Sequence, residues 1–188
     1  MTDVTQTNNK DIRKVGTMTK VSLLGAMAAV LMVIFKFPLP FAPPYMTVDF
    51  GDVPVLVAGF ALGPVAGVIT AFLKILLSLL LNGTTTAYVG EVSNFILAAS
   101  FVLVSSSIYK AKKTFKTAVI GIVVGAIVMT LIATLTNFYI IFPMYKVPVE
   151  SFTALASFVV PFNLVKSGLV GLVTILIYKP ISRIFKKF

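Results

Sequence analysis

Long apolar segments, separated by short clusters of polar and turn-forming residues, make up most of this chain. Several of these segments approach or exceed the ~20 residues that an α-helix needs to cross about 30 Å of hydrocarbon. We expect six helices, over residues 21–35, 52–62, 64–81, 88–109, 117–142 and 152–178. The pattern therefore predicts an all-α, polytopic membrane protein with six transmembrane helices.

The segment 38–51 between the first two predicted helices carries four prolines within its first seven residues. It cannot be helical throughout, so we expect an ordered loop or a capping plug. Asp52 and Pro54 then occupy the positions that favour the opening of a helix. The helix 52–62 would rise only about 16 Å at ~1.5 Å per residue, which is too short to cross a bilayer alone.

Basic residues decide the number of spans. Four precede the first helix, four follow the fourth and four follow the sixth: Lys10, Arg13, Lys14 and Lys20; Lys110, Lys112, Lys113 and Lys116; Lys179, Arg183, Lys186 and Lys187. Six spans place all twelve on one side, as the positive-inside rule requires, and both termini in the cytoplasm. We expect a flexible cytoplasmic lead (1–19), a transmembrane domain (20–180) with loop 38–51 as an extracellular lid, and a basic cytoplasmic tail (181–188).

The composition excludes several classes of catalytic and metal-binding site. The chain is 58% hydrophobic and contains no histidine or cysteine, which excludes Ser–His nucleophiles, H-E-x-x-H zinc sites, thiolate catalysis and disulfides. No G-x-x-x-x-G-K-[ST] loop is present either. The net charge of +10 follows from the positive-inside rule, so we expect no nucleic-acid partner. An intramembrane enzyme using Glu91 with Lys74 or Lys166 would lack a nucleophile–base pair, and we expect neither catalysis nor a cofactor.

Three of the predicted helices carry polar side chains three or four residues apart, and therefore on one face. These stripes are Asn163 with Lys166, Glu91 with Asn94, and Thr130 with Thr134 and Asn137. The threonines favour packing, through bonds to their own i−4 carbonyls. The asparagines are explained equally well by ligand contacts and by hydrogen bonds between helices.

A lysine at bilayer depth costs at least ~2.5–3.5 kcal/mol on insertion scales. Lys166 could pair with Glu91, but the two lie about 20 Å and 8 Å along their helices from the outer ends and need not meet. We therefore expect Lys166 to face a cavity filled by water or ligand. Lys74 poses the same problem, and we expect it to pair with Asp52 or Glu91.

Three short motifs together resemble the riboflavin-specific S components of energy-coupling factor (ECF) vitamin transporters. They are D-x-x-D-x-P at 49–54, G-E-x-x-N-F at 90–95 and P-F-N-x-x-K at 161–166. The resemblance spans roughly residues 20–179. It implies a six-helix subunit of the bacterial plasma membrane that captures riboflavin from outside, beneath the loop between its first two helices. It also implies a complex with a transmembrane coupling subunit and two cytoplasmic ATPases.

The same resemblance implies an A-x-x-x-A docking motif on the first helix. It maps onto Gly25 and Ala29, with Ala28 beside them. Small residues at this spacing let another helix approach closely. The alternative is that this face packs within the bundle.

For riboflavin, we expect Asn163 and Lys166 to meet the pyrimidine edge of the isoalloxazine, which offers acceptors and one donor. The other expected ligand contacts come from polar side chains and from the loop: Glu91, Asn94, Asn137 and Asp49; Phe41, Tyr45, Met46 and Thr47. Two alternatives stay open. One is an S component for thiamin, biotin or folate, and the other is a stand-alone secondary carrier, whose mark would be inverted repeats.

Overall fold

The computed structural model describes residues 2–43, 46–84, 86–144 and 155–186. Helix α1 (Thr2–Ile34) leads into a hairpin of two short strands, β1 (Lys36–Pro38) and β2 (Thr47–Asp49). Four helices follow: α2 (Asp52–Leu62), α3 (Pro64–Asn82), α4 (Val89–Ala111) and α5 (Phe115–Thr136). α5 continues through the π-helix η1 (Asn137–Ile141) into α6 (Phe142–Met144), and a second π-helix, η2 (Leu155–Val159), leads into α8 (Val160–Lys186).

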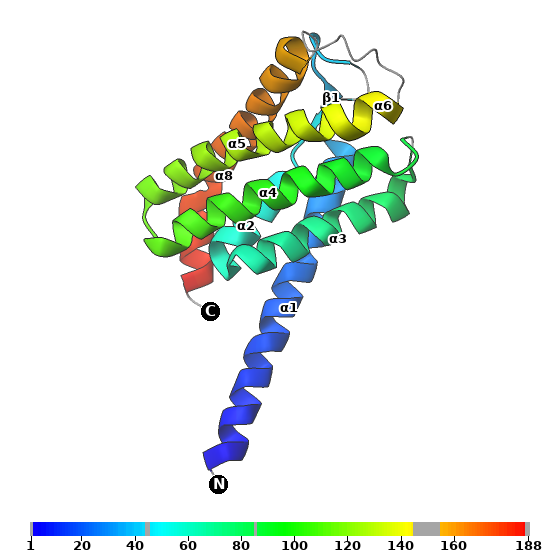
Figure 1. The fold of residues 1–188 in the computed structure, drawn as a ribbon. Helices are drawn as coiled ribbons and strands as arrows, with labels where there is room; N and C mark the ends of the chain where they lie inside the picture. The colour runs from blue at the N-terminus through cyan, green and yellow to red at the C-terminus, as the bar shows by residue number, and fades with distance from the viewer. Residues whose placement is uncertain (1, 44–45, 85, 145–154, 187–188) are drawn as a thin grey trace.

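The short helix α2 lies at the centre of the bundle and contacts α1, α3, α4 and α8. Every residue from Asp52 to Phe60 is buried. A helix that is apolar around its whole circumference is expected in such a position. Around it, α1 packs on α3, α3 on α4, α4 on α5, and α5 on α8, as Figure 1 shows.

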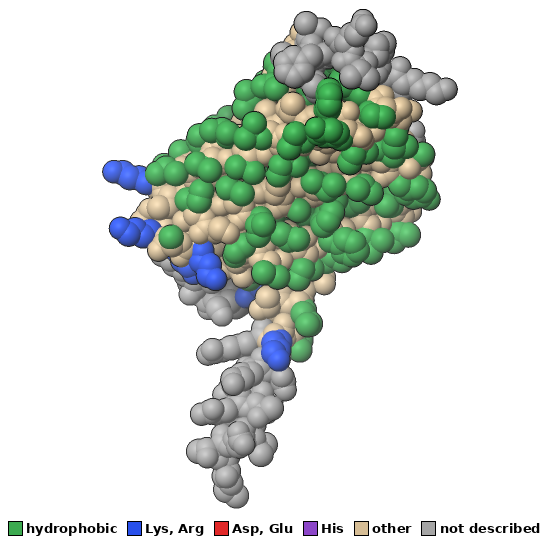
Figure 2. Space-filling model, in the orientation of Figure 1, with side chains coloured by type: hydrophobic (Ala, Val, Ile, Leu, Met, Phe, Trp, Pro, Cys, Tyr) green, Lys and Arg blue, Asp and Glu red, His purple; other side chains and the backbone are tan. Residues whose placement is uncertain are grey.

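The outer surface is that of a multi-pass membrane protein. Within the described residues, five helical segments are long and apolar enough to cross a membrane: Lys14–Ile34, Pro64–Asn82, Val89–Ala111, Phe115–Met144 and Ser157–Ile177. Hydrophobic side chains cover the body of the bundle in Figure 2, and lysines gather at one end. The turn between α4 and α5 lies at that end, and this turn and the adjoining helix ends carry the exposed Lys110, Lys112, Lys113 and Lys116. This distribution fits a cell-membrane protein.

Several helices extend beyond their predicted limits. α1 begins at Thr2 rather than near residue 21. The apolar pattern shows which part of a helix can lie in lipid. The polar residues that precede it in the chain contain no proline, so the helix can begin before the apolar segment. Pro143 lies within α6, and α8 continues past Pro180 to Lys186. A proline removes one backbone hydrogen bond, and helices of membrane proteins tolerate this where neighbouring groups replace it. The bounds of α2 are as predicted.

The hairpin is the part of the fold that the all-α prediction missed. Its strands pair antiparallel, with Lys36 opposite Asp49 and Pro38 opposite Thr47. Strands of three residues are too short to reveal an alternating pattern in the sequence. The hairpin places Val48 and Asp49 inside the bundle, where they are 0% and 1% exposed.

Candidate functional site

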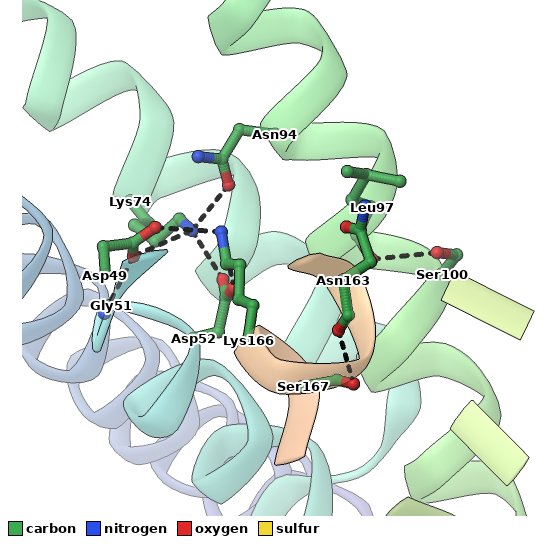
Figure 3. Close-up of polar contacts among 10 residues, drawn as sticks. All are labelled: Asp49, Gly51, Asp52, Lys74, Asn94, Leu97, Ser100, Asn163, Lys166 and Ser167. Carbon is green, nitrogen blue, oxygen red and sulfur yellow. Dashed lines mark hydrogen bonds and ion pairs between the residues drawn. The ribbon is translucent and has the colours of Figure 1, made fainter. Parts of the chain in front are cut away.

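Two aspartates and two lysines meet in a buried cluster that joins β2, α2, α3 and α8 (Figure 3). Nζ of Lys74 lies 2.5 Å from Oδ1 of Asp52 and 3.9 Å from Oδ1 of Asp49. Nζ of Lys166 lies 3.0 Å from Oδ2 of Asp49 and 3.5 Å from Oδ2 of Asp52. None of the four residues is more than 4% exposed. Because the two positive and two negative charges balance, the cluster avoids the large penalty of an unpaired buried ion.

The backbone beside the cluster leaves no room for a side chain at Gly51. Its N–H donates to Oδ1 of Asp49 at 3.0 Å, and an added Cβ would lie 2.6 Å from the carbonyl oxygen of Ala28. Burial alone would raise the pKa of Asp49. The ion pairs with Lys166 and Lys74, and the hydrogen bonds from Lys166 and Gly51, outweigh that effect and hold this pKa well below its usual range. Asp49 is therefore ionised at neutral pH.

These contacts add one ion pair that the sequence did not indicate and confirm another. Lys166, which was expected to face a cavity and not to need Glu91, pairs with Asp49. The pairing of Lys74 with Asp52 is confirmed. The cavity expected beside Lys166 is also present, because its side chain lines a pocket next to the cluster.

This pocket has a cavity volume of about 100 Å³, within about 550 Å³ of empty space that includes open solvent at its mouth. Its wall combines polar groups with apolar surface, as in most sites for small organic molecules. The polar lining residues are Thr47, Ser93, Asn94, Asn137, Asn163 and Lys166, and the others are Met46, Gly90, Leu97, Ile141 and Phe162. Of the predicted ligand contacts, six lie in this wall: Met46, Thr47, Asn94, Asn137, Asn163 and Lys166.

Three asparagines of the pocket are held by hydrogen bonds within the protein. Nδ2 of Asn137 donates to the carbonyl of Ala133, and Nδ2 of Asn163 donates to that of Val159, both at 2.8 Å. Oδ1 of Asn94 accepts from Nζ of Lys74 at 3.1 Å. Asn137 begins η1 and Val159 ends η2. Since π-helical segments often occur at functional sites, both irregular turns fit a ligand-binding wall. The sequence pattern did not indicate either π-helix.

Other predicted ligand contacts lie away from the pocket wall. Glu91 accepts a hydrogen bond from Oγ1 of Thr86 at 2.6 Å and faces a groove between α3 and α4, while its neighbour Gly90 lines the pocket. Phe41 is 48% exposed, and Asp49 reaches the pocket through Lys166. Tyr45 lies outside the described residues.

The threonine stripe on α5 behaves as the packing interpretation predicted. Oγ1 of Thr130 donates to the carbonyl of Ala126, and Oγ1 of Thr134 donates to the carbonyl of Thr130.

Residues 16–178 match the family model described as "ECF transporter, substrate-specific component". The chain belongs to this family. It is therefore an S component, and its sequence is 38% identical over 174 residues to "Riboflavin transporter RibU" of Staphylococcus aureus (strain TCH60), covering 89% of this chain and 90% of that protein. It is 33% identical over 174 residues to "Riboflavin transporter FmnP" of Bacillus subtilis (strain 168), with 88% and 91% covered.

Solved structures agree with this membership. The S component superimposes with a TM-score of 0.80 on a chain described as "Structure and mechanism of the S component of a bacterial ECF transporter". That chain is 38% identical, and the match covers 92% of this S component and 99% of the solved chain. A second structure, of ThiT from Listeria monocytogenes, has a TM-score of 0.59 at 16% identity over 93% of this chain and 96% of that one. This second match shows the shared fold alone.

The predicted partner face on α1 of the S component faces its own bundle. Ala28 and Ala29 are 0% and 1% exposed, and a Cβ added to Gly25 would lie 2.8 Å from Cβ of Leu73 in α3. These residues therefore cannot present a surface to another subunit in this structure. The adjoining face, with Ser22 and Ala26 four residues apart, is exposed. Because small residues occur on both faces, the sequence could not tell which face is buried.

Proposed function

We propose that this chain is the riboflavin-binding membrane subunit of an ECF-type, ATP-dependent vitamin importer. It captures riboflavin on the extracellular side and delivers it inward together with a transmembrane coupling subunit and two cytoplasmic ATPases. The pocket carries this proposal, because it combines apolar surface with hydrogen-bonding side chains that include Asn94, Asn137, Asn163 and Lys166. The names of the Staphylococcus and Bacillus relatives support riboflavin as the substrate.

The chemistry of the pocket suits an isoalloxazine ring. Leu97 and Phe162 offer apolar surface to the flat ring system. Asp49 and Asp52 occupy two of the three N–H donors of Lys166, so one remains for a flavin carbonyl. Asn163 keeps its Oδ1 and one N–H beyond its bond to the backbone, which suits an edge that carries both acceptors and a donor.

The proposed topology has six spans, with α2 counted as one, and both termini in the cytoplasm. The α4–α5 turn and the C-terminal end of α8 lie on one side of the bundle, opposite the hairpin (Figure 1). Met46, Thr47 and Gly90 line the pocket at the hairpin end, away from the exposed lysines at the α4–α5 turn. The positive-inside rule then puts the pocket outside. Segment 38–51 is the proposed lid of the 20–180 domain, between a cytoplasmic lead (1–19) and tail (181–188).

The proposed docking surface for the coupling subunit is the exposed face of α1. Ser22 and Ala26 provide small residues on that face, and Leu23 and Met27 beside them are 62% and 47% exposed. Such a face allows close helix packing within the bilayer. The chain itself binds riboflavin as cargo, without catalysis and without a resident cofactor.

Titration of the purified, ligand-stripped protein tests the proposal. We expect riboflavin to bind at one equivalent, with quenching of its fluorescence, and thiamin, biotin and folate to leave that signal unchanged. Binding of one of those three vitamins in place of riboflavin would refute the assignment. Vesicles that contain this chain alone should accumulate no riboflavin, whereas ion-driven accumulation would identify a secondary carrier.

A further inference from the structure

Lys74 stands behind the pocket wall and contacts one of its asparagines. It is 0% exposed and does not line the pocket, yet its Nζ lies 3.1 Å from Oδ1 of Asn94, which does. An ammonium group can only donate hydrogen bonds. Chemistry therefore requires that Asn94 turn its oxygen toward Lys74 and its NH₂ group away from it. Figure 3 shows the oxygen of Asn94 directed at Nζ of Lys74 and its nitrogen turned aside from that contact.

Asp52 holds the ammonium group of Lys74 where it contacts Asn94. The 2.5 Å contact between Nζ of Lys74 and Oδ1 of Asp52 fixes the ammonium on the side of the cluster that faces α4. Rotating the amide of Asn94 would set its NH₂ against a buried cation. Hydrogen bonds to charged groups are stronger than neutral ones, and a buried donor left without an acceptor is costly. The amide is therefore held in one orientation.

We propose that Lys74 is a positioning residue that determines ligand specificity through Asn94. With the oxygen of Asn94 engaged, Asn94 and Lys166 both offer the pocket only N–H donors. This part of the wall accepts a heterocycle edge that carries carbonyl oxygens and rejects one that carries an amino group. The inference rests on the proposed function only in taking this pocket to bind a flat heterocycle.

A matched pair of fluorescent bicyclic probes tests the preference directly. 6,7-Dimethyllumazine has two carbonyl groups on its pyrimidine ring, and 6,7-dimethylpterin has an amino group in place of one of them. The wild-type protein should bind the lumazine at least about tenfold more tightly, because an amino group of the pterin that lies against Asn94 and Lys166 faces only N–H donors. Equal affinities, or a preference for the pterin, would overturn the inference.

The variant Asp52→Asn/Lys74→Gln tests the role of Lys74 while the cluster stays electroneutral. Glutamine both donates and accepts, so Asn94 is free to turn, and the lumazine-to-pterin ratio should fall to within about twofold of one. Thr70→Val is the matched control. It changes a buried residue one turn earlier in α3, whose hydroxyl bonds to its own backbone at Ala66, and it should keep the wild-type ratio. A wild-type ratio in the double variant would overturn the role given to Lys74.

Asn94→Leu provides a second route if the double variant does not fold. It removes the amide at similar volume, so it should weaken lumazine binding and leave pterin binding unchanged. Equal loss of both probes would contradict the donor-only wall. Riboflavin is titrated in parallel. A wild-type protein that prefers the lumazine but does not bind riboflavin refutes the proposed function alone, and one that binds riboflavin without the preference refutes this inference alone.

Discussion

The ammonium of Lys166 lies 3.0 Å from Oδ2 of Asp49, although 117 positions separate the two residues in the chain. This contact ties the hairpin, which carries Asp49 at the end of β2, to the helix α8, which forms part of the pocket wall. A group that binds the pocket at Lys166 therefore acts on the same side chain that holds the hairpin. The loop and the ligand site are physically linked.

Lys166 should have separable effects on stability and on binding. In Lys166→Met, two aspartates face one lysine, and we expect the free energy of unfolding to fall by about 3–5 kcal/mol. Riboflavin affinity should fall about 10- to 150-fold, since a hydrogen bond to a charged group contributes about 1.5–3 kcal/mol. Thermal unfolding of the ligand-free protein and fluorescence titration measure the two effects.

The double variant Asp49→Asn/Lys166→Met serves as the control for charge. It leaves Asp52 paired with Lys74, so it should recover much of the lost stability and none of the lost affinity. Recovery of both would mean that Lys166 acts on binding only by holding the hairpin.

Gly51 should be intolerant of any side chain. In Gly51→Ala, the new Cβ would lie 2.6 Å from the carbonyl oxygen of Ala28 and 2.9 Å from Oδ1 of Asp49, so the hairpin must move away from α1. We expect a lower melting temperature together with weaker riboflavin binding, at a cost of about 1–3 kcal/mol for overpacking. Gly168→Ala is the control, because nothing lies within 4 Å of the position that its new Cβ would take and alanine favours the helix. A wild-type melting temperature for Gly51→Ala would contradict the packing described for the hairpin.

The helices were predictable from the sequence because apolar length and basic clusters carry that information locally. The bounds of α2 and the pocket asparagines Asn137 and Asn163 follow from such patterns. The pairing of Lys166 with Asp49 could not be predicted from the sequence, because Asp49 lies in a proline-rich loop whose path no periodicity describes. The helical rise indicated that Lys166 need not meet Glu91, and Glu91, in the first turn of α4, instead accepts a hydrogen bond from Thr86 in the preceding loop.

The local sequence pattern also did not show which face of a helix packs against the bundle. Gly25 and Ala26 are adjacent small residues on α1, yet Gly25 is buried against Leu73 and Ala26 is exposed. In a soluble protein the polar face would identify the outside. In a bilayer both faces are apolar, so only packing decides.

The exposed face of α1 should bind the coupling subunit. Ala26→Trp adds bulk where another helix would approach, so we expect it to reduce co-purification with the coupling subunit at least about tenfold. Riboflavin binding by the isolated chain should stay at the wild-type level. Gly25→Val is the matched comparison on the buried face, and it should lower the melting temperature because of its clash with Leu73. Normal assembly of Ala26→Trp would refute the assignment of this face.

Stability and binding should not vary with pH between about 5 and 8. The pKa of Asp49 is lowered in the folded protein, mainly because the nearby Lys166 and Lys74 overcome the effect of burial. A lowered pKa means that the stabilisation is complete above the usual aspartate value of about 3.9, and is lost as the pH falls below it toward the folded-state pKa. The chain contains no histidine that could titrate near neutrality. Melting temperatures across pH 3–8 should therefore be level down to about pH 5 and fall below about pH 4, with a smaller fall in Asp49→Asn. A midpoint near pH 6 would show that the buried cluster does not keep the charges assigned to it.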